Sequence, residues 1–533
     1  MSEELLSINE ASKWATIYLK KFVSPSNISY LIQYANLKRV IDGEGKITIN
    51  KEELKRYYDE YLLTKQEEWK AKLGKDLNWG LSFDYLKESD TTKHVHRLHP
   101  YKGKFIPQLV EYFLDGHINN FKKEVFFKER DIILDPFMGC GTTLVQASEL
   151  GMHSIGVDIS EFNVLISKVK TDDYNIFELN YVLKGALTKT IQYSQETFDD
   201  SYDEELKNRL SKFNKEYFPS FEFKHHIKEG RINEYEYGEE NLNQFITSNN
   251  DLLSENGVKN KSNLFDEEDM TSFLSKWFTK RIKQELSFYL NLIEKMEQEQ
   301  FKNVMRIILS RTARSCRATT HFDLATLKEP QIGPYYCRKH RKICTPVNSI
   351  IKHLRRYTYD TIKRLDVYSN LKKEVYACPL HGDSREINIF DEIRKISPSF
   401  YEILQAKKIA GIFTSPPYVG QIDYHEQHAY SYELFGIPRL DEKEIGPLSK
   451  GLGKKAKEKY VEEISKVLLN ISDFIVDGGN FFIVANDKHD LYPIIAQKSD
   501  LKIINQFKRP VLNRTERDRQ PYAEIIFQMK KDI

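Results

Sequence analysis

Residues 130–151 read RDIILDPFMGCGTTLVQASELG, and this stretch decides the fold class. A short apolar run at its start has the length of a buried strand and ends at Asp135. Gly139 and Gly141 predict a tight turn, and glycine there lets a ligand approach the backbone closely. Thr142 is then expected to open a helix. The stretch therefore predicts a strand, a glycine-rich turn and a helix.

The following segment, HSIGVDIS at residues 153–160, predicts a second strand that ends at Asp158. A carboxylate at the tip of the second strand, about 20 residues after a glycine-rich turn, is typical of a site that binds a ribose diol. The turn is not a phosphate-binding loop, because no Gly-Lys-Ser/Thr follows, and its spacing differs from GxGxxG. An ordinary strand–helix–strand turn without a ligand is the alternative.

A second stretch, residues 412–421, reads IFTSPPYVGQ. Another apolar run ends there in Pro416 and Pro417, which lack an N–H group and hold the chain in a stiff, extended turn. Ser415 adds a hydroxyl and Tyr418 a flat aromatic face. The turn therefore suits a planar base that bears an exocyclic amine, and a proline-rich turn without a function is the alternative.

Length and composition set the broad class. A chain of 533 residues is long enough for roughly two to four domains. The 80 Lys+Arg nearly balance the 78 Asp+Glu, so any basic surface must be local. No run approaches the ~18 apolar residues of a membrane span, and the first residues lack the pattern of a secretory signal. Five cysteines do not suggest a disulfide framework, so we expect a cytoplasmic protein.

Residues 1–65 predict a small helical head. The pattern is a helix over SINEASKWATIYLKKF, a second short helix starting near Ser24 or Ser26, a hairpin around Gly43–Gly45 and a helix capped by Asn50. This order resembles the winged helix-turn-helix heads of excisionase and MerR-type proteins, in which the second helix enters the major groove. A helical cap packed on the main domain is the alternative.

After a connector at residues 66–93, the chain continues to a long insertion at residues 171–370. The insertion shows no strand alternation and predicts mainly helices, with long amphipathic ones over residues 271–311. Residues 301–365 hold fifteen Lys+Arg against three Asp+Glu. We expect this excess to contact a phosphate backbone, and an ordinary basic solvated face is the alternative. The predicted nucleic-acid contacts are Arg314, Arg317, Arg338, Lys339, Arg341, Arg355 and Arg356.

Some cysteine and histidine spacings are compatible with zinc. They are Cys337-x-x-His340 with Cys344, and Cys378-x-x-His381. The second pair lies in VYACPLHGD, which predicts a core strand and its end. We therefore expect no metal, while zinc at Cys337, His340 and Cys344 stays open.

Residues 371–533 supply further strands. One precedes Asp383, one ends in TSPPY, one contains FFIVA, and two more form a closing antiparallel pair. With the two strands above, they predict an α/β fold, a doubly wound Rossmann-like sheet that binds ligands at the carboxyl ends of its strands. Asp135, Asp158, Asp383 and Ser415 fall at such ends.

Three motifs, in order, resemble those of the S-adenosylmethionine-dependent DNA amino-methyltransferases. YKGKFIPQL resembles motif X, DPFMGCGTT motif I and TSPPY the catalytic motif IV, whose Ser form is typical of cytosine-N4 enzymes. The resemblance implies a methyltransferase core whose cofactor half is residues 94–170 and whose catalytic half is residues 371–533. It places target recognition in residues 171–370.

The resemblance also implies residue roles. S-adenosylmethionine would be bound by Lys104, Phe105, Asp135, Phe137, Gly139, Gly141, Thr142, Asp158 and Asp383. The catalytic turn would consist of Ser415, Pro416, Pro417 and Tyr418.

The implied reaction methylates the exocyclic N4 of a cytosine flipped out of double-stranded DNA. The resemblance further implies that the protein modifies DNA for a restriction–modification or defence system, with a separately encoded endonuclease as a candidate partner. Such a protein would act at the nucleoid in the prokaryotic cytoplasm. Adenine-N6 methylation, RNA base methylation and a catalytically silent DNA-binding protein are the alternatives.

Overall fold

The structure is a computed structural model of the chain. It describes residues 4–531 except 20–22, 34–36, 42–45, 87, 256–271, 322, 324–326 and 513–519. The chain divides into two compact units. The helical unit comprises Met1–Gly74, Gln192–Glu285 and Ser315–Ile350, and the sheet unit comprises Lys75–Ile191, Leu286–Arg314 and Ile351–Ile533. Among the described residues, no helix has the length and apolar character that a membrane span needs.

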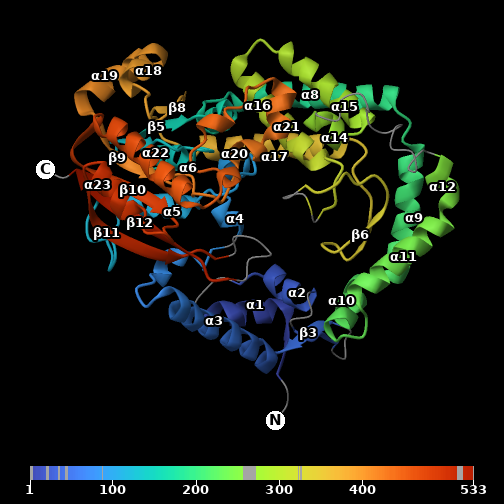
Figure 1. Ribbon diagram of the computed structural model, residues 1–533. Helices are drawn as coiled ribbons and strands as arrows, with labels where there is room; N and C mark the ends of the chain where they lie inside the picture. Colours follow the sequence, from blue (N-terminus) through green and yellow to red (C-terminus); the bar gives the residue numbers. More distant parts are fainter. Residues whose placement is uncertain are drawn as a thin grey trace. The chain divides into compact units, whose positions relative to one another are not determined.

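The sheet unit is built on seven strands, which confirms the predicted α/β class. They are β4 (Ile132–Asp135), β5 (His153–Asp158), β8 (Ala377–His381), β9 (Ile409–Thr414), β10 (Ile475–Ala485), β11 (Leu501–Pro510) and β12 (Ala523–Lys531). Their order in the sheet is β11-β12-β10-β9-β4-β5-β8 (Figure 1). Only β12 runs antiparallel to its neighbours, so the closing antiparallel pair is also confirmed.

Helices cover both faces of this sheet because the strands are apolar on both sides. Successive side chains alternate between faces: Leu134 and Ile412 belong to one core cluster, and Ile133 and Phe413 to the other. The first cluster includes α18 (Ile389–Ile396), α19 (Pro398–Lys407), α22 (Lys454–Ser472) and α23 (Tyr492–Lys498). The second includes α5 (Pro107–Leu114) and α6 (Thr142–Glu149).

The strand order reverses between β4 and β9. From β4 the chain proceeds to β5 and β8 on one side, and then returns to place β9 and β10 on the other. In such a sheet, ligands bind outside the carboxyl ends of the strands at the reversal point. The two loops that begin there are DPFMGCG after β4 and SPPY after β9, the two stretches that the sequence singles out.

The N-terminal part of the helical unit has the predicted order of elements. These are β1 (Leu5–Ser7), α1 (Ile8–Tyr18), α2 (Pro25–Gln33), β2 (Val40–Ile41), β3 (Ile47–Asn50) and α3 (Lys51–Leu73). Asn50 caps α3 as predicted, accepting hydrogen bonds from Glu52 N and Glu53 N. The predicted hairpin turn, Gly43–Gly45, lies outside the described residues. The resemblance to a DNA-binding head stays a prediction.

The head is not separate from the insertion. Phe221 of α10 (Ser220–Lys228) packs against the apolar cluster of the head, and the Arg39 guanidinium lies 5.2 Å from the centre of its ring. The predicted insertion, residues 171–370, contributes to both units. The functional domain boundaries therefore stay a prediction.

The insertion is mainly helical, as expected. Its described helices are α8 (Ile176–Thr197), α9 (Ser201–Tyr217), α10, α11 (Glu234–Ser248), α12 (Asn250–Glu255), α14 (Phe273–Trp277), α15 (Lys280–Glu294), α16 (Glu299–Cys316) and α17 (Ile351–Ser369). The sequence shows no sign of β6 (Tyr335–Cys337) and β7 (Lys342–Cys344), which form an antiparallel hairpin within the insertion. Strands of three residues are too short to show an alternating pattern.

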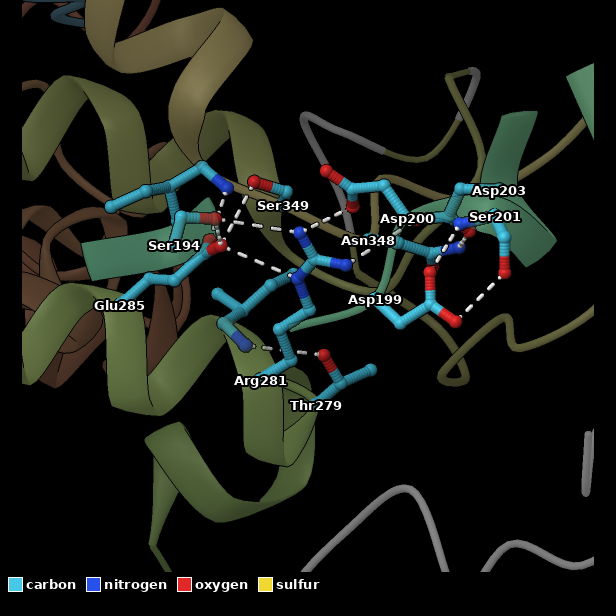
Figure 2. A network of polar contacts seen from close by, with 12 residues as sticks. Ser194, Asp199, Asp200, Ser201, Asp203, Thr279, Arg281, Glu285, Asn348 and Ser349 are labelled. Carbon is cyan, nitrogen blue, oxygen red and sulfur yellow. Dashed lines mark hydrogen bonds and ion pairs between the residues drawn. The ribbon is translucent and has the colours of Figure 1, made fainter. Parts of the chain in front are cut away.

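A buried carboxylate connects several segments of the helical unit (Figure 2). Glu285 is fully buried and accepts hydrogen bonds from Ser194 Oγ at 2.7 Å, Ser349 Oγ at 3.0 Å and Ile350 N at 2.7 Å. Arg281 balances its charge, with Nε 3.3 Å from Glu285 Oε1. A buried charge needs such partners, since leaving it unpaired is costly.

Candidate active site

A cavity of the sheet unit lies at the carboxyl ends of β4, β5, β8 and β9. The predicted residues that line it are Lys104, Phe105, Asp135, Phe137, Gly139, Thr142, Asp158, Asp383, Ser415 and Pro417. Gly141, Pro416 and Tyr418 belong to the same loops but do not line the cavity. The fold therefore brings together residues as far apart in the sequence as Lys104 and Pro417.

Asp135 connects the glycine-rich loop to the Ser-Pro-Pro-Tyr loop. Thr414 Oγ1 donates a hydrogen bond of 2.6 Å to Asp135 Oδ1, and Phe137 N donates one of 3.2 Å to the same oxygen. Burial raises the pKa of Asp135 to about 6, although these hydrogen bonds oppose the rise. Asp135 therefore positions the two loops in addition to lining the cavity.

Asp158 is held by three donors at the tip of β5. Ser160 N and Asn163 Nδ2 donate to Oδ1 at 2.8 and 3.0 Å, and Gly139 N donates to Oδ2 at 2.9 Å. Burial raises its pKa to about 6. Because a carboxylate oxygen can accept two hydrogen bonds, Oδ2 retains capacity for a ligand hydroxyl, as the predicted ribose site requires.

The glycine turn needs its two glycines. Gly139 and Gly141 have φ values of +49° and +73°, a region that residues with a side chain rarely adopt. A Cβ at Gly139 would lie 2.8 Å from the Tyr101 hydroxyl, and one at Gly141 would lie 2.8 Å from Ser167 Oγ. The two glycines therefore allow Tyr101 and Ser167 to pack directly against the turn.

The predicted motif X residues contribute one charge and one ring. Lys104 Nζ donates a hydrogen bond to the His96 carbonyl oxygen, and burial lowers its pKa to about 8. The Phe105 ring packs edge-on against Phe413 of β9, with ring centres 5.5 Å apart. Phe105 thus packs this segment against the sheet, and Lys104 holds it to the preceding turn at His94–Arg97.

Asp383 is paired within the protein. Arg385 donates to both of its oxygens, with Nε 2.9 Å from Oδ1 and Nη2 2.6 Å from Oδ2. Burial acts to raise the pKa of Asp383, but the hydrogen bonds from Arg385 outweigh it and the pKa is lowered. Nearby, Ser384 Oγ donates to the Pro136 carbonyl at 2.6 Å and joins the loop after β8 to that after β4.

The Ser-Pro-Pro-Tyr turn is anchored to the neighbouring part of the sheet. Ser415 Oγ donates a long hydrogen bond of 3.5 Å to the Tyr418 hydroxyl, which itself donates to Glu524 Oε1 on β12 at 2.9 Å. Burial raises the pKa of Tyr418 well above its usual value, so the phenol is neutral. Ser415 faces the cavity, and Tyr418 is oriented by Glu524.

Comparison with known proteins identifies the family. A sequence model described as DNA methylase (N6_N4_Mtase) matches residues 13–169. The type II methyltransferase M.MjaII of Methanocaldococcus jannaschii is 49% identical over 531 residues, which cover 100% of this chain and 98% of that protein. The chain belongs to the N4/N6 DNA methyltransferase family. Its methyl donor is S-adenosylmethionine.

More distant relatives match shorter regions of the methyltransferase. The type II methyltransferase M.MvaI of Kocuria varians is 33% identical over 112 residues, or 21% of this chain and 23% of that protein. M.BsoBI of Geobacillus stearothermophilus is 32% identical over 99 residues, or 18% of each chain.

The cavity of the methyltransferase fits this cofactor. Asp158 Oδ2 has capacity to accept from a ribose hydroxyl, and Asp158 and Gly139 both line the cavity. Sequence reasoning assigned no role to other lining residues, namely Tyr101, Asn163, Tyr432, Lys443 and Glu444. Tyr101 lies within YKGKFIPQL, so the motif could have indicated it. The loop with Lys443 and Glu444 carries no sequence signal, and only the fold brings it to the cavity.

The seven basic residues predicted to contact nucleic acid are divided between the units of the methyltransferase. Arg317, Arg338, Lys339 and Arg341 belong to the helical unit, and Arg314, Arg355 and Arg356 to the sheet unit. In the helical unit Arg338 and Lys339 are exposed, whereas Arg317 is buried. Because its side chain is buried, Arg317 is poorly placed to contact DNA. A single phosphate-binding surface formed by all seven residues stays a prediction.

Proposed function

We propose that this methyltransferase transfers a methyl group to the exocyclic N4 of a cytosine at a specific site in double-stranded DNA. The observation that carries the proposal is that Ser415 lines the same cavity as Asp158 and the glycine turn. The Ser-Pro-Pro-Tyr turn is thus next to the space that suits the cofactor. The serine form of this turn favours cytosine over adenine.

The chain's residues would act by positioning the base. A cytosine must first leave the helical stack, which costs a few kcal/mol. Stacking on Tyr418, whose hydroxyl is fixed by Glu524, would offset part of this cost. The exocyclic amino group would donate hydrogen bonds to Ser415 Oγ and to the Pro416 carbonyl, which draws its lone pair out of conjugation with the ring. When bound, S-adenosylmethionine supplies an electrophilic methyl group on a sulfonium.

No covalent bond between enzyme and base is needed in this scheme. The amine nitrogen would take the methyl group as the methyl–sulfur bond breaks and would then release one of its protons. The rate therefore depends on alignment of the two reactants and on the polar groups around them. Pro416 and Pro417 serve alignment because their fixed φ angles keep the turn rigid. Asp135 also contributes to the alignment of the two reactants, because its hydrogen bond with Thr414 holds the two loops together.

A cellular role in a restriction–modification system follows from the proposal. The named relatives are type II methyltransferases. We therefore expect a separately encoded endonuclease as partner, and action on DNA at the nucleoid in the cytoplasm.

The direct test is nucleoside analysis. Purified enzyme is incubated with labelled S-adenosylmethionine and DNA of mixed sequence, and the DNA is digested and separated. Label in N4-methylcytosine is the expected result, and the Ser415→Ala variant should incorporate label on the order of 100-fold more slowly. Label in N6-methyladenine would instead establish the adenine alternative, and label only when RNA replaces DNA would overturn the proposal.

A further inference from the structure

Two histidines and two cysteines converge in the helical unit. His321, Cys337, His340 and Cys344 each place one ligand atom within 4.8 Å of those of the others. Cys337 Sγ lies 3.7 Å from His321 Nδ1, and Cys344 Sγ lies 3.5 Å from His340 Nδ1. In a tetrahedral zinc site, with Zn–S of about 2.3 Å and Zn–N of about 2.0–2.1 Å, sulfur and nitrogen ligands are about 3.6 Å apart. The four side chains are therefore already spaced as ligands of one ion.

The β6–β7 hairpin explains how three of them meet. Its register pairs Tyr335 with Cys344 and Cys337 with Lys342, so the two cysteines occupy the same face. The other face carries Tyr336 and Ile343, which pack into the apolar cluster formed mainly by α9 and α11. The hairpin thus has one apolar face against helices and one face that gathers sulfur and nitrogen atoms.

The turn of the hairpin directs His340 toward the cysteines. Arg341 adopts the left-handed region with φ of +50°, and Arg341 N donates to the Cys337 carbonyl at 2.6 Å. This tight turn brings His340 N within 3.4 Å of Cys337 Sγ, to which it donates a hydrogen bond. Such a donor stabilises a thiolate, the form of cysteine that binds metal.

We propose that His321, Cys337, His340 and Cys344 bind one Zn²⁺ in a closed, structural site. Two thiolates and two imidazoles form a ligand set that suits zinc, and four protein ligands leave no position for a substrate. The hairpin also needs a support, since two short strands are marginally stable alone. The sequence expectation of no metal omitted His321, which lies 16 residues before Cys337 in a different segment.

Metal binding would change the hydrogen bonds between His321 and Tyr335. Tyr335 Oη lies 2.7 Å from His321 Nδ1 and accepts a hydrogen bond from His321 N at 3.0 Å. A neutral imidazole nitrogen has one lone pair, so Nδ1 cannot accept from the hydroxyl while it binds zinc. The hydroxyl then keeps the backbone N–H of His321 as its partner.

Cys378 and His381, the other spacing noted in the sequence, lie in β8 of the sheet unit and are not part of this cluster.

The site would hold a basic turn in place. Between the ligands lie Arg338, Lys339, Arg341 and Lys342, and the first two and Lys342 are exposed. If this turn contacts phosphates, which rests on the proposed function, zinc would pre-organise it for DNA. Loss of zinc should then weaken DNA binding and leave S-adenosylmethionine binding in the sheet unit intact.

The first test is the metal content of the full-length, untagged protein, measured by plasma mass spectrometry after purification without chelator. We expect one zinc per chain in the wild type and in Cys316→Ser, which alters a buried cysteine outside the cluster. Cys344→Ser and His340→Gln should lose most of the zinc. Cobalt substitution of the wild type should give the intense visible bands of a tetrahedral thiolate site, a readout independent of the variants' folding.

Three results would overturn the proposal. They are wild-type protein that folds and binds S-adenosylmethionine without zinc, a Cys337–Cys344 disulfide found by peptide mapping under non-reducing conditions, and full zinc content in both ligand variants. The metal measurement uses no substrate. A protein with stoichiometric zinc but no methyl transfer would therefore contradict the proposed function and leave the site standing.

Discussion

Thr414 and Asp135, 279 residues apart in the sequence, are joined by a hydrogen bond of 2.6 Å between the threonine hydroxyl and Asp135 Oδ1. Both residues are buried and terminate adjacent parallel strands, β9 and β4. The bond fixes the start of the Ser-Pro-Pro-Tyr turn against the start of the glycine turn. The distance between the proposed methyl donor and the proposed acceptor base thus depends on a bond between two residues that would not themselves react.

Removal of this bond should affect stability and rate together. Thr414→Val keeps the shape but leaves a buried carboxylate oxygen short of a donor, which should cost about 1–3 kcal/mol. Thermal unfolding and steady-state methylation measure the two effects. Thr190→Val is the matched control, since Thr190 Oγ1 is buried but donates only to the Ala186 carbonyl of its own helix. Equal losses in both variants would show that the contact between the loops has no special role.

Cofactor affinity should depend on pH through Asp158. Burial raises the pKa of this carboxyl to about 6, so it is mostly ionised at pH 7.5 and mostly protonated at pH 5. If the ionised form must accept the ribose hydroxyls, the apparent Kd should rise about tenfold for each pH unit below 6. Calorimetry between pH 5 and 8 measures it. Asp158→Asn should bind weakly at every pH, and an unchanged pH profile in that variant would assign the titration to another group.

The catalytic turn should separate chemistry from cofactor binding. Ser415→Ala removes one acceptor for the amino group, and we expect the turnover rate to fall on the order of 100-fold. Tyr418→Ala removes the stacking surface, worth about 1–3 kcal/mol per base, whereas Tyr418→Phe keeps the ring and should lose less. S-adenosylmethionine binding should persist in all three. Ser465→Ala, a buried hydroxyl in α22 outside the cavity lining, is the control, and a fully active Tyr418→Ala enzyme would contradict the site assignment.

The buried carboxylate of the helical unit should be a stability determinant without a catalytic role. Glu285→Gln leaves Arg281 paired with Asp200 but turns one buried acceptor into a donor that faces other donors, which should cost about 1–3 kcal/mol. In urea, the helical unit should unfold at a lower concentration than in the wild type. S-adenosylmethionine binding should be preserved. Glu294→Gln replaces a carboxylate that is half exposed and should change little. Loss of cofactor binding in Glu285→Gln would contradict the prediction.

The predicted DNA contact of α2 is best tested by a point substitution. Deletion of residues 1–65 would remove the apolar cluster on which Phe221 packs and leave Phe221 exposed, so a loss of binding would be ambiguous. Ser26 is exposed in the first turn of α2, where an added carboxylate favours the helix but repels phosphate. Ser26→Glu should weaken DNA binding several-fold in a filter assay. Ser89→Glu, exposed in α4 (Glu88–Thr91), carries the same charge and should bind normally.

The sequence by itself determined the chemistry of the two decisive loops. The residues that end β4, β5 and β9 could be read in order because short apolar runs, glycines and prolines act locally on the backbone. The seven strands, the closing antiparallel pair, the Asn50 cap and the family resemblance were all predictable for this reason. The three-residue strands β6 and β7 were not, since they form only where Tyr336 and Ile343 find an apolar surface.

Only the tertiary structure decided which distant residues meet. The Thr414–Asp135 bond, the bond from Ser384 to the Pro136 carbonyl, the place of Glu444 at the cavity and the approach of His321 to Cys337 join segments that no local pattern connects. Their physical cause is packing: once the strands and helices bury their apolar faces, the polar groups at the element ends must find partners among whatever neighbours the fold supplies.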